Sequence, residues 1–99
     1  MSGSRGVYRL RPRAEADLEE IWLYTRDRWS LEQANSYLRA LSAAFAGLAT
    51  GVCVGRATDV RNGYFKYTIG SHLIFYVKTE VGVEVVRVLH ERMDVMRHL

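Results

Sequence analysis

The first half of the chain carries one short strand-like pattern followed by two helical ones. Apolar and basic residues alternate over residues 7–11, which is typical of a short strand. Pro12 stands where a helix begins, and apolar residues then recur at spacings of three and four. A second helical pattern starts after Ser30, whose Ser-x-x-Gln spacing indicates a capping box, and ends around Gly51. Because the connection is so short, residues 12–50 are predicted to form an antiparallel helix hairpin.

The second half changes from helical spacing to strand-like runs. These runs cover residues 64–69, 72–77 and 83–90, after an irregular polar segment at 51–62. Gly70-Ser71 has the form of a two-residue hairpin turn. We therefore expect a three-stranded antiparallel meander over residues 64–90. Apolar residues recur at every third position of residues 91–99, which predicts a short tail helix.

The order of these elements predicts an α+β fold. We expect an N-terminal strand, a two-helix antiparallel hairpin packed on a small antiparallel β-sheet, and a short C-terminal helix. A chain of 99 residues holds one hydrophobic core, so residues 1–99 are interpreted as a single domain. Residues 1–6 are rich in glycine and serine, and we expect them to be disordered.

The central strand is apolar on both faces, although one helix hairpin covers only one of them. Leu73, Phe75 and Val77 alternate with Ile74 and Tyr76 along this strand. On the last strand, alternation places Val83, Val85 and Leu89 on one face together with Arg87. An uncovered apolar face beside an arginine marks a binding surface. The alternative is that the tail helix covers part of this face.

Composition and charge narrow the class of protein. The chain is 48% hydrophobic and 25% charged, which favours a globular protein over a disordered one. Its net charge is +3, but the helical middle is acidic and the basic residues flank it, so we do not expect direct nucleic-acid binding. All basic residues except Lys66 and Lys78 are arginines, which suit forked contacts with carboxylate or phosphate.

The sequence lacks the residues that several kinds of catalytic and metal-binding sites require. The single cysteine, Cys53, excludes an internal disulfide and a multi-thiolate metal site, and no predicted helix begins beside it to activate the thiol. There is no phosphate-binding glycine loop and no paired histidine motif, so no metal and no cofactor are expected. No signal peptide and no membrane-spanning run are recognisable, so we expect a cytoplasmic protein without a membrane partner.

One group of residues has a possible catalytic interpretation. Arg61, Arg87 and His90, with Lys66, belong to the predicted sheet and resemble a metal-independent ribonuclease site if they converge. The alternative is that they are solvated charges at strand edges, with a histidine satisfied at a strand end. Spacing alone favours the second interpretation, so no catalytic residue is assigned.

Three segments together resemble toxins of the ParE type, within the RelE/ParE superfamily. They are Ala16–Trp22 with Tyr24, Trp29 and Gln33-Ala34; Gly70–Tyr76; and Val86–Asp94. Their order and spacing agree over almost the whole chain. The resemblance implies a helix hairpin on a small antiparallel sheet, as the patterns predict independently.

The resemblance also implies a function. A ParE-type toxin belongs to a bacterial type II toxin–antitoxin pair, inhibits DNA gyrase, and is neutralised in a hetero-oligomer by a ParD-like antitoxin with a ribbon-helix-helix N-terminus. The disordered half of such an antitoxin would fold onto the apolar surface of the toxin. Two alternatives remain: a RelE-like ribosome-dependent mRNA endonuclease using Arg61, Arg87 and His90, and a degenerate member that binds antitoxin without being toxic. His90 is followed by Glu91-Arg92 without an aromatic residue, which matches the ParE pattern better than the nuclease pattern.

The chain departs from the ParE pattern at three places. Phe65, followed by Lys66, stands where relatives usually have an arginine, and Val77 stands where many have another. Thr50-Gly51 replaces a proline that is usual after the second helix. These departures keep the alternative of a non-toxic member open.

Candidate contact residues follow from exposure expected on the helices and the sheet. For the antitoxin we expect two surfaces, which comprise Tyr24, Arg28 and Tyr37 on the hairpin, and Phe75, Met93 and Met96, near Arg87, on the open sheet face. Arg87 and Arg92 are the candidates for contact with the target. Trp22 and Trp29 are assigned to the core.

Overall fold

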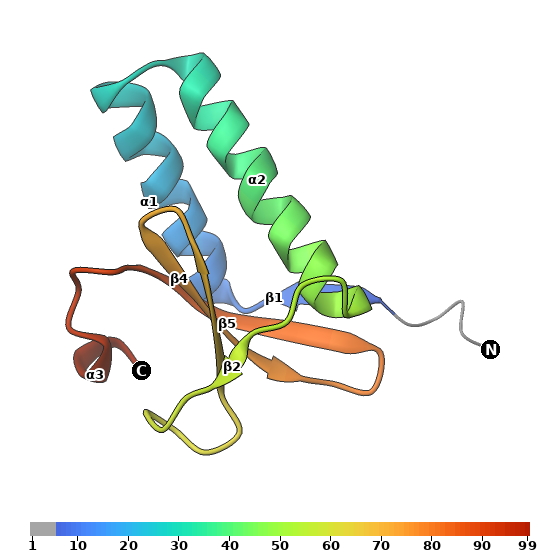
Figure 1. Ribbon diagram of the computed structural model, residues 1–99. Helices are drawn as coiled ribbons and strands as arrows, with labels where there is room; N and C mark the ends of the chain where they lie inside the picture. The colour runs from blue at the N-terminus through green and yellow to red at the C-terminus, as the bar shows by residue number, and fades with distance from the viewer. Residues whose placement is uncertain (1–5) are drawn as a thin grey trace.

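The computed structural model describes residues 6–99 of the chain (Figure 1). Apart from Gly6, the expectation of disorder at residues 1–6 lies outside the described residues. The elements in chain order are β1 (Val7–Leu10), α1 (Pro12–Arg28), α2 (Leu31–Thr50), β2 (Arg56–Ala57), β3 (Phe65–Ile69), β4 (His72–Lys78), β5 (Gly82–His90) and α3 (Val95–His98). The predicted α+β fold is confirmed.

Local signals define the ends of the helix hairpin. Pro12 opens α1 at its first position, where its missing N–H needs no partner. The Ser30 hydroxyl accepts a hydrogen bond from the Gln33 N–H at 3.0 Å and caps α2. Gly51 ends α2 in the left-handed conformation, at φ 87°, which favours glycine. The helices stand side by side above the sheet (Figure 1).

The sheet has five strands in the order β1-β5-β4-β3-β2. The three pairs β2–β3, β3–β4 and β4–β5 are antiparallel, as expected for a meander. The pair β1–β5 is parallel, so the sheet is mixed and not purely antiparallel. The two-residue strand β2 lies in the segment that was expected to be irregular. A short edge strand of this kind has too few residues to show a period of two.

The main core lies between the hairpin and one face of the sheet. Leu41 and Phe45 of α2 pack there with Ile74 of β4 and Val85 of β5, and all four are almost fully buried. Tyr8 of β1 packs on Phe45 with ring centroids 5.5 Å apart. The face of α2 predicted from helical spacing therefore points into the core.

A register shift in the β4–β5 pair changes which side chains share a face. Phe75 is opposite Arg87, but the next residue, Tyr76, is opposite Val85, so Val86 is an extra residue in β5. As a result Val88 joins Val83 and Val85 in the hairpin-side core. Simple alternation along β5 was wrong beyond this bulge.

The sheet face away from the hairpin is not open. Phe75 is only 1% exposed, and Val86 and Leu89 are also buried. The C-terminal segment lies on this side (Figure 1), where Arg87 Nη1 donates to the His98 carbonyl at 3.0 Å and Arg61 Nη2 donates to the Leu99 carbonyl at 3.4 Å. The prediction that Phe75 is an exposed anchor on an open face is therefore wrong.

The tail helix is shorter than its pattern indicated. Only Val95–His98 is helical, because Asp94 caps the helix by accepting from the Met96 N–H at 3.2 Å. The residues before it form a turn in which the Met93 N–H donates to the His90 carbonyl. The tail is held by the hydrogen bonds from Arg61 and Arg87, and Met96 stays exposed.

The contact between β1 and β5 depends on a glycine. Gly82 is opposite Val7, and a Cβ atom at Gly82 would collide with the Val7 carbonyl oxygen. We expect Gly82→Ala to push β1 away and to lower the free energy of unfolding by about 1–3 kcal/mol, measured by urea denaturation. Gly47→Ala is the matched control, since its methyl group would meet the Cys53 side chain, which can move. Equal stability of the two variants would contradict the close contact between β1 and β5 at Gly82.

Candidate functional site

A groove of about 640 Å³ lies between the helix hairpin and the adjoining end of the sheet. The hairpin contributes aromatic and basic side chains, and the β3–β4 turn and the end of β5 contribute polar ones. Four candidate antitoxin contacts line this one groove: Tyr24, Arg28, Tyr37 and Met93. Met93, which was expected on the other sheet face, joins the hairpin residues because the chain turns back after β5.

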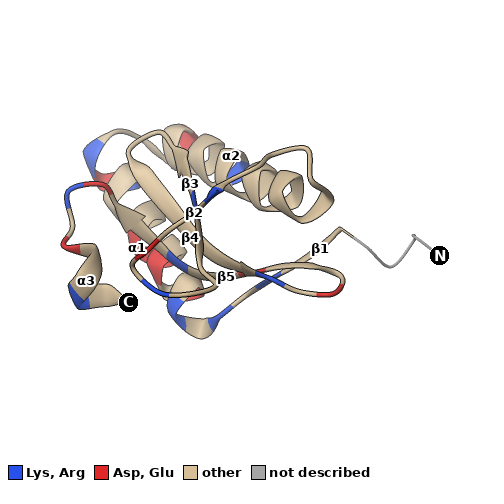
Figure 2. Ribbon diagram, turned by 60° about the horizontal axis from the view of Figure 1, so that its bottom comes forward, with Lys and Arg blue, Asp and Glu red and all other residues tan. Residues whose placement is uncertain are grey.

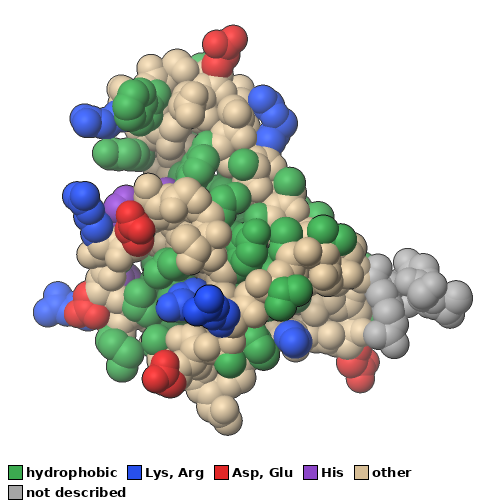
Figure 3. All heavy atoms as spheres, viewed as in Figure 1, with side chains coloured by type: hydrophobic (Ala, Val, Ile, Leu, Met, Phe, Trp, Pro, Cys, Tyr) green, Lys and Arg blue, Asp and Glu red, His purple; other side chains and the backbone are tan. Residues whose placement is uncertain are grey.

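Aromatic side chains form the outer rim of the groove. Trp29 is 70% exposed and Tyr24 is 65% exposed, and the Arg28 guanidinium lies 6.0 Å from the Trp29 ring centroid. Figure 3 shows hydrophobic and basic side chains together at the upper end of the molecule, where the hairpin tip lies. Exposed tryptophan, tyrosine and arginine are the residues enriched at the energetic centres of protein interfaces.

The assignment of both tryptophans to the core needs correction. Trp29 lies at the corner between the helices, where it caps α1 while Ser30 caps α2, so its side chain projects outward. This corner position could have been recognised from the capping residues alone. Trp22 is only half-buried, and its indole N–H donates to Asn35 Oδ1 at 2.9 Å.

Tyr37, His72 and His90 form a polar cluster at the sheet side of the groove. The Tyr37 hydroxyl lies 2.6 Å from His72 Nδ1, and the rings of His72 and His90 meet edge to face with centroids 5.3 Å apart. Burial raises the pKa of Tyr37. Burial, and then the neighbouring His90, lower the pKa of His72, so His72 is neutral at pH 7. The sequence analysis missed His72, which the pairing of β4 with β5 places opposite His90.

This lowered pKa predicts how stability depends on pH. The unfolded chain binds a proton at His72 near the ordinary pKa of 6.5, whereas the folded protein binds it only at a lower pH. Stability is therefore expected to fall as the pH drops from 6.5 towards the folded-state pKa. Urea denaturation at pH 7.5 and 5.5 measures this loss, and His72→Asn should reduce it. The same pH dependence in both proteins would contradict the role of His72.

Asp17 and Arg87 form a largely buried ion pair beside the groove. Both oxygens of Asp17 accept from Arg87, each at 2.8 Å, and one also accepts from the Val88 N–H at 2.9 Å. The two side chains are 11% and 13% exposed, and the hydrogen bonds that Arg87 donates to Asp17 raise the pKa of Arg87. Figure 2 shows acidic residues of α1 lying against the sheet. The expectation that Arg87 offers its guanidinium to a target is therefore wrong.

The three residues of the endonuclease alternative do not come together with free side chains. Arg61 and Arg87 both donate to carbonyls at the end of the tail, and Arg87 is also paired with Asp17. His90 lines the groove instead, with its Nδ1 occupied by the Arg92 N–H at 3.1 Å. Arg92 and Met96 are both exposed, as the candidate contacts require.

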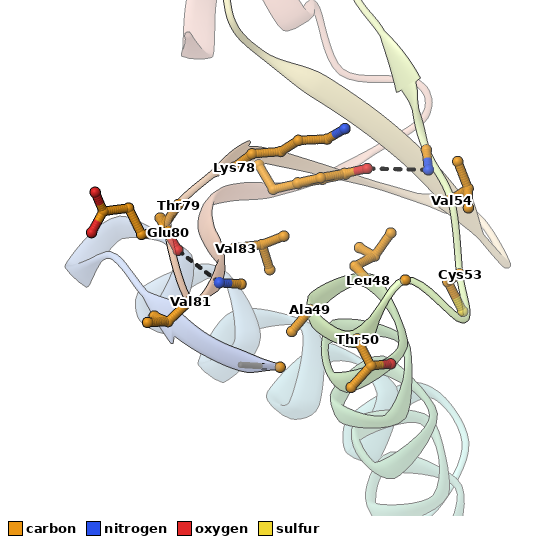
Figure 4. A pocket seen from close by; sticks show the side chains of 15 residues that line it. Leu48, Ala49, Thr50, Cys53, Val54, Lys78, Thr79, Glu80, Val81 and Val83 are labelled. Carbon is orange, nitrogen blue, oxygen red and sulfur yellow. Dashed lines mark hydrogen bonds between the residues drawn. The ribbon is translucent and has the colours of Figure 1, made fainter. Parts of the chain in front are cut away.

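A second hollow, of about 440 Å³, lies at the end of α2 beside the β4–β5 turn (Figure 4). Its polar groups serve the fold: the Tyr76 hydroxyl accepts from the Gly55 N–H, and the Thr79 hydroxyl accepts from the Gly82 N–H. Cys53 lines this hollow. Residues 6–99 contain no group of three or more histidine, cysteine or acidic side chains placed to hold a metal ion.

In the part of the chain that the structure describes, no helix combines the length and the apolar character needed to cross a membrane.

Comparisons with known proteins agree on one protein family. A family model described as the ParE toxin of the type II toxin–antitoxin system parDE matches residues 8–95. Toxin ParE1 of Mycobacterium tuberculosis (strain H37Rv) is 52% identical over 94 residues, which cover 93% of this chain and 96% of that protein. Toxin ParE1 of Caulobacter vibrioides is 43% identical over 93 residues, with the same coverage of both chains.

A solved structure supports the fold. A chain of the structure described as the chromosomal ParDE TA system from P. aeruginosa superposes with a TM-score of 0.75. The match covers 89% of this chain and 98% of that chain at 14% identity.

Proposed function

The chain belongs to the ParE toxin family of type II toxin–antitoxin systems, and we propose that it inhibits DNA gyrase and is neutralised by a ParD-like antitoxin. The observation that carries this proposal is the 52% identity to Toxin ParE1 along nearly the full length of both chains. Gyrase as the target follows from the known action of ParE toxins. The site of action would then be the bacterial cytoplasm.

The toxin acts by binding rather than by chemistry of its own. A phosphodiester-cleaving site needs a base and a charged stabiliser free to reach one phosphate. Here Arg61 and Arg87 hold the C-terminal tail, and His90 lies in a groove that neither arginine lines. This arrangement supports inhibition of gyrase over cleavage of mRNA.

The antitoxin binds in the groove between the hairpin and the sheet. The rim offers Tyr24 and Trp29, whose exposed rings would be buried by a partner segment, and Tyr37, Arg28 and Met93 also line the groove. Burying one large apolar side chain stabilises a complex by about 1.5–3 kcal/mol. A few such contacts are enough to hold a disordered antitoxin segment that folds on binding, in a toxin–antitoxin hetero-oligomer whose other half carries the ribbon-helix-helix.

The target contacts lie outside this groove. Arg92 is exposed on the C-terminal segment and does not line the groove. Met96, which was expected to contact the antitoxin, also lies outside the groove. With Arg87 committed to Asp17, Arg92 is the remaining candidate arginine for contact with gyrase.

Induced expression in bacteria tests whether the chain is toxic. We expect growth arrest with induction of the DNA-damage response, and normal growth when a ParD-like antitoxin from the same locus is co-expressed. Unimpaired growth would support a non-toxic, antitoxin-binding member instead. Cleavage of mRNA in a translating extract would support the endonuclease alternative.

A further inference from the structure

The sheet face away from the helix hairpin, here called the outer sheet face, carries a row of basic side chains. Residues that are opposite each other in neighbouring strands point to the same face of a sheet. Arg56 of β2 is opposite Lys66 of β3, and Lys66 is opposite Phe75 of β4. Phe75 is in turn opposite Arg87 of β5. The row therefore places three cations on the outer sheet face, with the buried ring of Phe75 between them.

Two more arginines extend this face towards its other edge. Arg9 of β1 is opposite Glu84 of β5, and Glu84 is opposite Val77 of β4. Val77 is two residues from Phe75, so Arg9 also points to the outer sheet face. Arg11 follows β1, and its Nη2 donates to Glu84 Oε1 at 3.1 Å. Strands lie about 4.8 Å apart, so the five strands spread these cations over about 19 Å.

The acidic residues near this face are few, and two of them are already paired. Glu84 is the only acidic residue in the five strands, and it pairs with Arg11. Asp17 of α1 pairs with Arg87. The other acidic residues outside the hairpin lie in loops and turns: Asp59, Glu80, Glu91 and Asp94. The strands therefore contribute more basic than acidic charge to the outer sheet face.

Three cations of the outer sheet face have no acidic partner. In the part of the chain that the structure describes, no carboxylate forms an ion pair with Arg9, Arg56 or Lys66. Arg9 and Arg56 are exposed, and Lys66 is half-buried. Arg61, in the loop after β2, is also exposed, and its guanidinium lies 5.7 Å from the Tyr64 ring centroid. These side chains are free to contact a ligand of opposite charge.

The two sides of the molecule carry opposite charge. Residues 12–50 of the hairpin contain four basic and six acidic side chains, whereas residues 6–11 and 51–99 together contain nine basic and five acidic ones. Figure 2 shows basic positions (blue) along the strands. A polyanion is therefore attracted to the sheet and repelled by the hairpin. The sequence analysis did not expect nucleic-acid binding because it counted charge along the chain, whereas the sheet gathers cations from separate segments.

The outer sheet face suits a nucleic acid better than a protein. Protein interfaces have an apolar centre from which charged residues are depleted. The large apolar side chains at the centre of this face, Phe75 and Leu89, are buried in the toxin itself. Interfaces with DNA are more polar and much more positively charged. Duplex DNA carries one negative charge for about every 1.7 Å of its length, so several phosphates fit across a face about 19 Å wide.

We propose that the outer sheet face binds the phosphate backbone of DNA through Arg9, Arg56 and Lys66, and that in the inhibited complex this DNA is the segment held by gyrase. The second half of the proposal rests on the proposed inhibition of gyrase. The hairpin groove and the outer sheet face lie on different sides of the sheet, so the antitoxin and the DNA have separate binding surfaces.

Fluorescence anisotropy with a labelled duplex of about 20 base pairs tests the face in the free toxin. The dissociation constant should lie between about 1 and 100 μM at physiological salt, as for sequence-independent binding. Each phosphate contact contributes about −0.9 to the slope of log Kobs against log salt, so three contacts give a slope of about −3. No binding at about 50 mM salt, or a slope near zero, would overturn the proposal.

A matched pair of double variants locates the binding surface. Arg9→Gln, Arg56→Gln removes one exposed cation from each edge of the sheet, so the slope should shrink by about 2 and the affinity should fall at least tenfold. Arg26→Gln, Arg39→Gln lowers the net charge equally but on the hairpin, and should bind DNA within about threefold of wild type. Urea denaturation checks that both variants keep the stability of the wild type. Equal losses of affinity in both would overturn the proposal.

Two further probes separate DNA from other polyanions. The duplex is expected to bind more tightly than polyglutamate of equal charge and than single-stranded RNA of equal length. Tighter binding of polyglutamate would assign the face to an acidic protein segment. Tighter binding of the RNA would assign it to RNA. Either result would overturn the assignment to DNA.

A gyrase assay distinguishes failure of this proposal from failure of the proposed function. The Arg9→Gln, Arg56→Gln toxin should need about tenfold more protein than wild type to inhibit supercoiling. If it inhibits as well as wild type, gyrase is the target and the DNA contact is wrong. If wild-type toxin leaves gyrase active but binds the duplex with the expected salt dependence, the proposed function fails and the DNA-binding face stands.

Discussion

Replacing Asp17 with alanine is expected to lower the free energy of unfolding by about 3 kcal/mol, because the change leaves a buried cation without its partner. Arg87 would lose two hydrogen bonds of 2.8 Å, and the Val88 N–H would lose its acceptor. β1 ends opposite Val85, so β1 offers no acceptor to this N–H of β5. Chemical denaturation of the purified toxin measures the loss.

Asp27→Ala is the control for this substitution. Asp27 also pairs with an arginine of α1, Arg26, but its side chain is 68% exposed, so the loss should be below about 0.5 kcal/mol. The double variant Asp17→Leu, Arg87→Met should recover part of the lost stability, since it removes both charges together. Equal effects of Asp17→Ala and Asp27→Ala would show that the ion pair does not support the fold.

Removing the aromatic rim of the groove is expected to have the largest effect on antitoxin binding. Each of Tyr24→Ala and Trp29→Ala should cost about 2 kcal/mol of binding free energy, as residues at the centre of an interface do. The double variant should therefore bind at least a hundredfold more weakly. Both side chains are exposed in the toxin, so their removal should leave the stability of the fold almost unchanged.

Valines at the other end of the molecule provide the matched control. Val52 and Val54 are 84% and 78% exposed, next to the second hollow and away from the groove. Val52→Ala and Val54→Ala should change the antitoxin affinity by less than about twofold. Tight binding by the rim variant together with weak binding by the valine variants would show that the antitoxin binds beside the second hollow and not in the groove.

The helix hairpin was predictable because its signals are local. A proline, a capping serine and a left-handed glycine define the helix ends within a few residues of sequence. The pairing of β1 with β5 was not predictable in this way. The two strands are more than seventy positions apart, and a pattern of alternation names a strand but not its partner.

The candidate site also contains residues that local patterns identify and residues whose role depends on distant parts of the chain. Tyr24, Arg28 and Tyr37 were found because helical spacing shows which residues share a face, whereas Phe75 was placed wrongly because alternation does not show what covers a strand. Arg87 was misjudged for a related reason, since its partner Asp17 lies in a different element. Hydrophobicity alone assigned Trp29 to the core, although its position at the corner between the two helices favours exposure.

The most direct test of the proposed function is a supercoiling and cleavage assay with purified DNA gyrase. The toxin at micromolar concentration is expected to inhibit supercoiling and to increase cleaved DNA, and stoichiometric antitoxin should reverse both effects. The Tyr24→Ala, Trp29→Ala toxin should inhibit gyrase equally well but escape the antitoxin, since the groove serves neutralisation and not the target. A wild-type toxin that leaves gyrase fully active at this concentration would contradict the proposal.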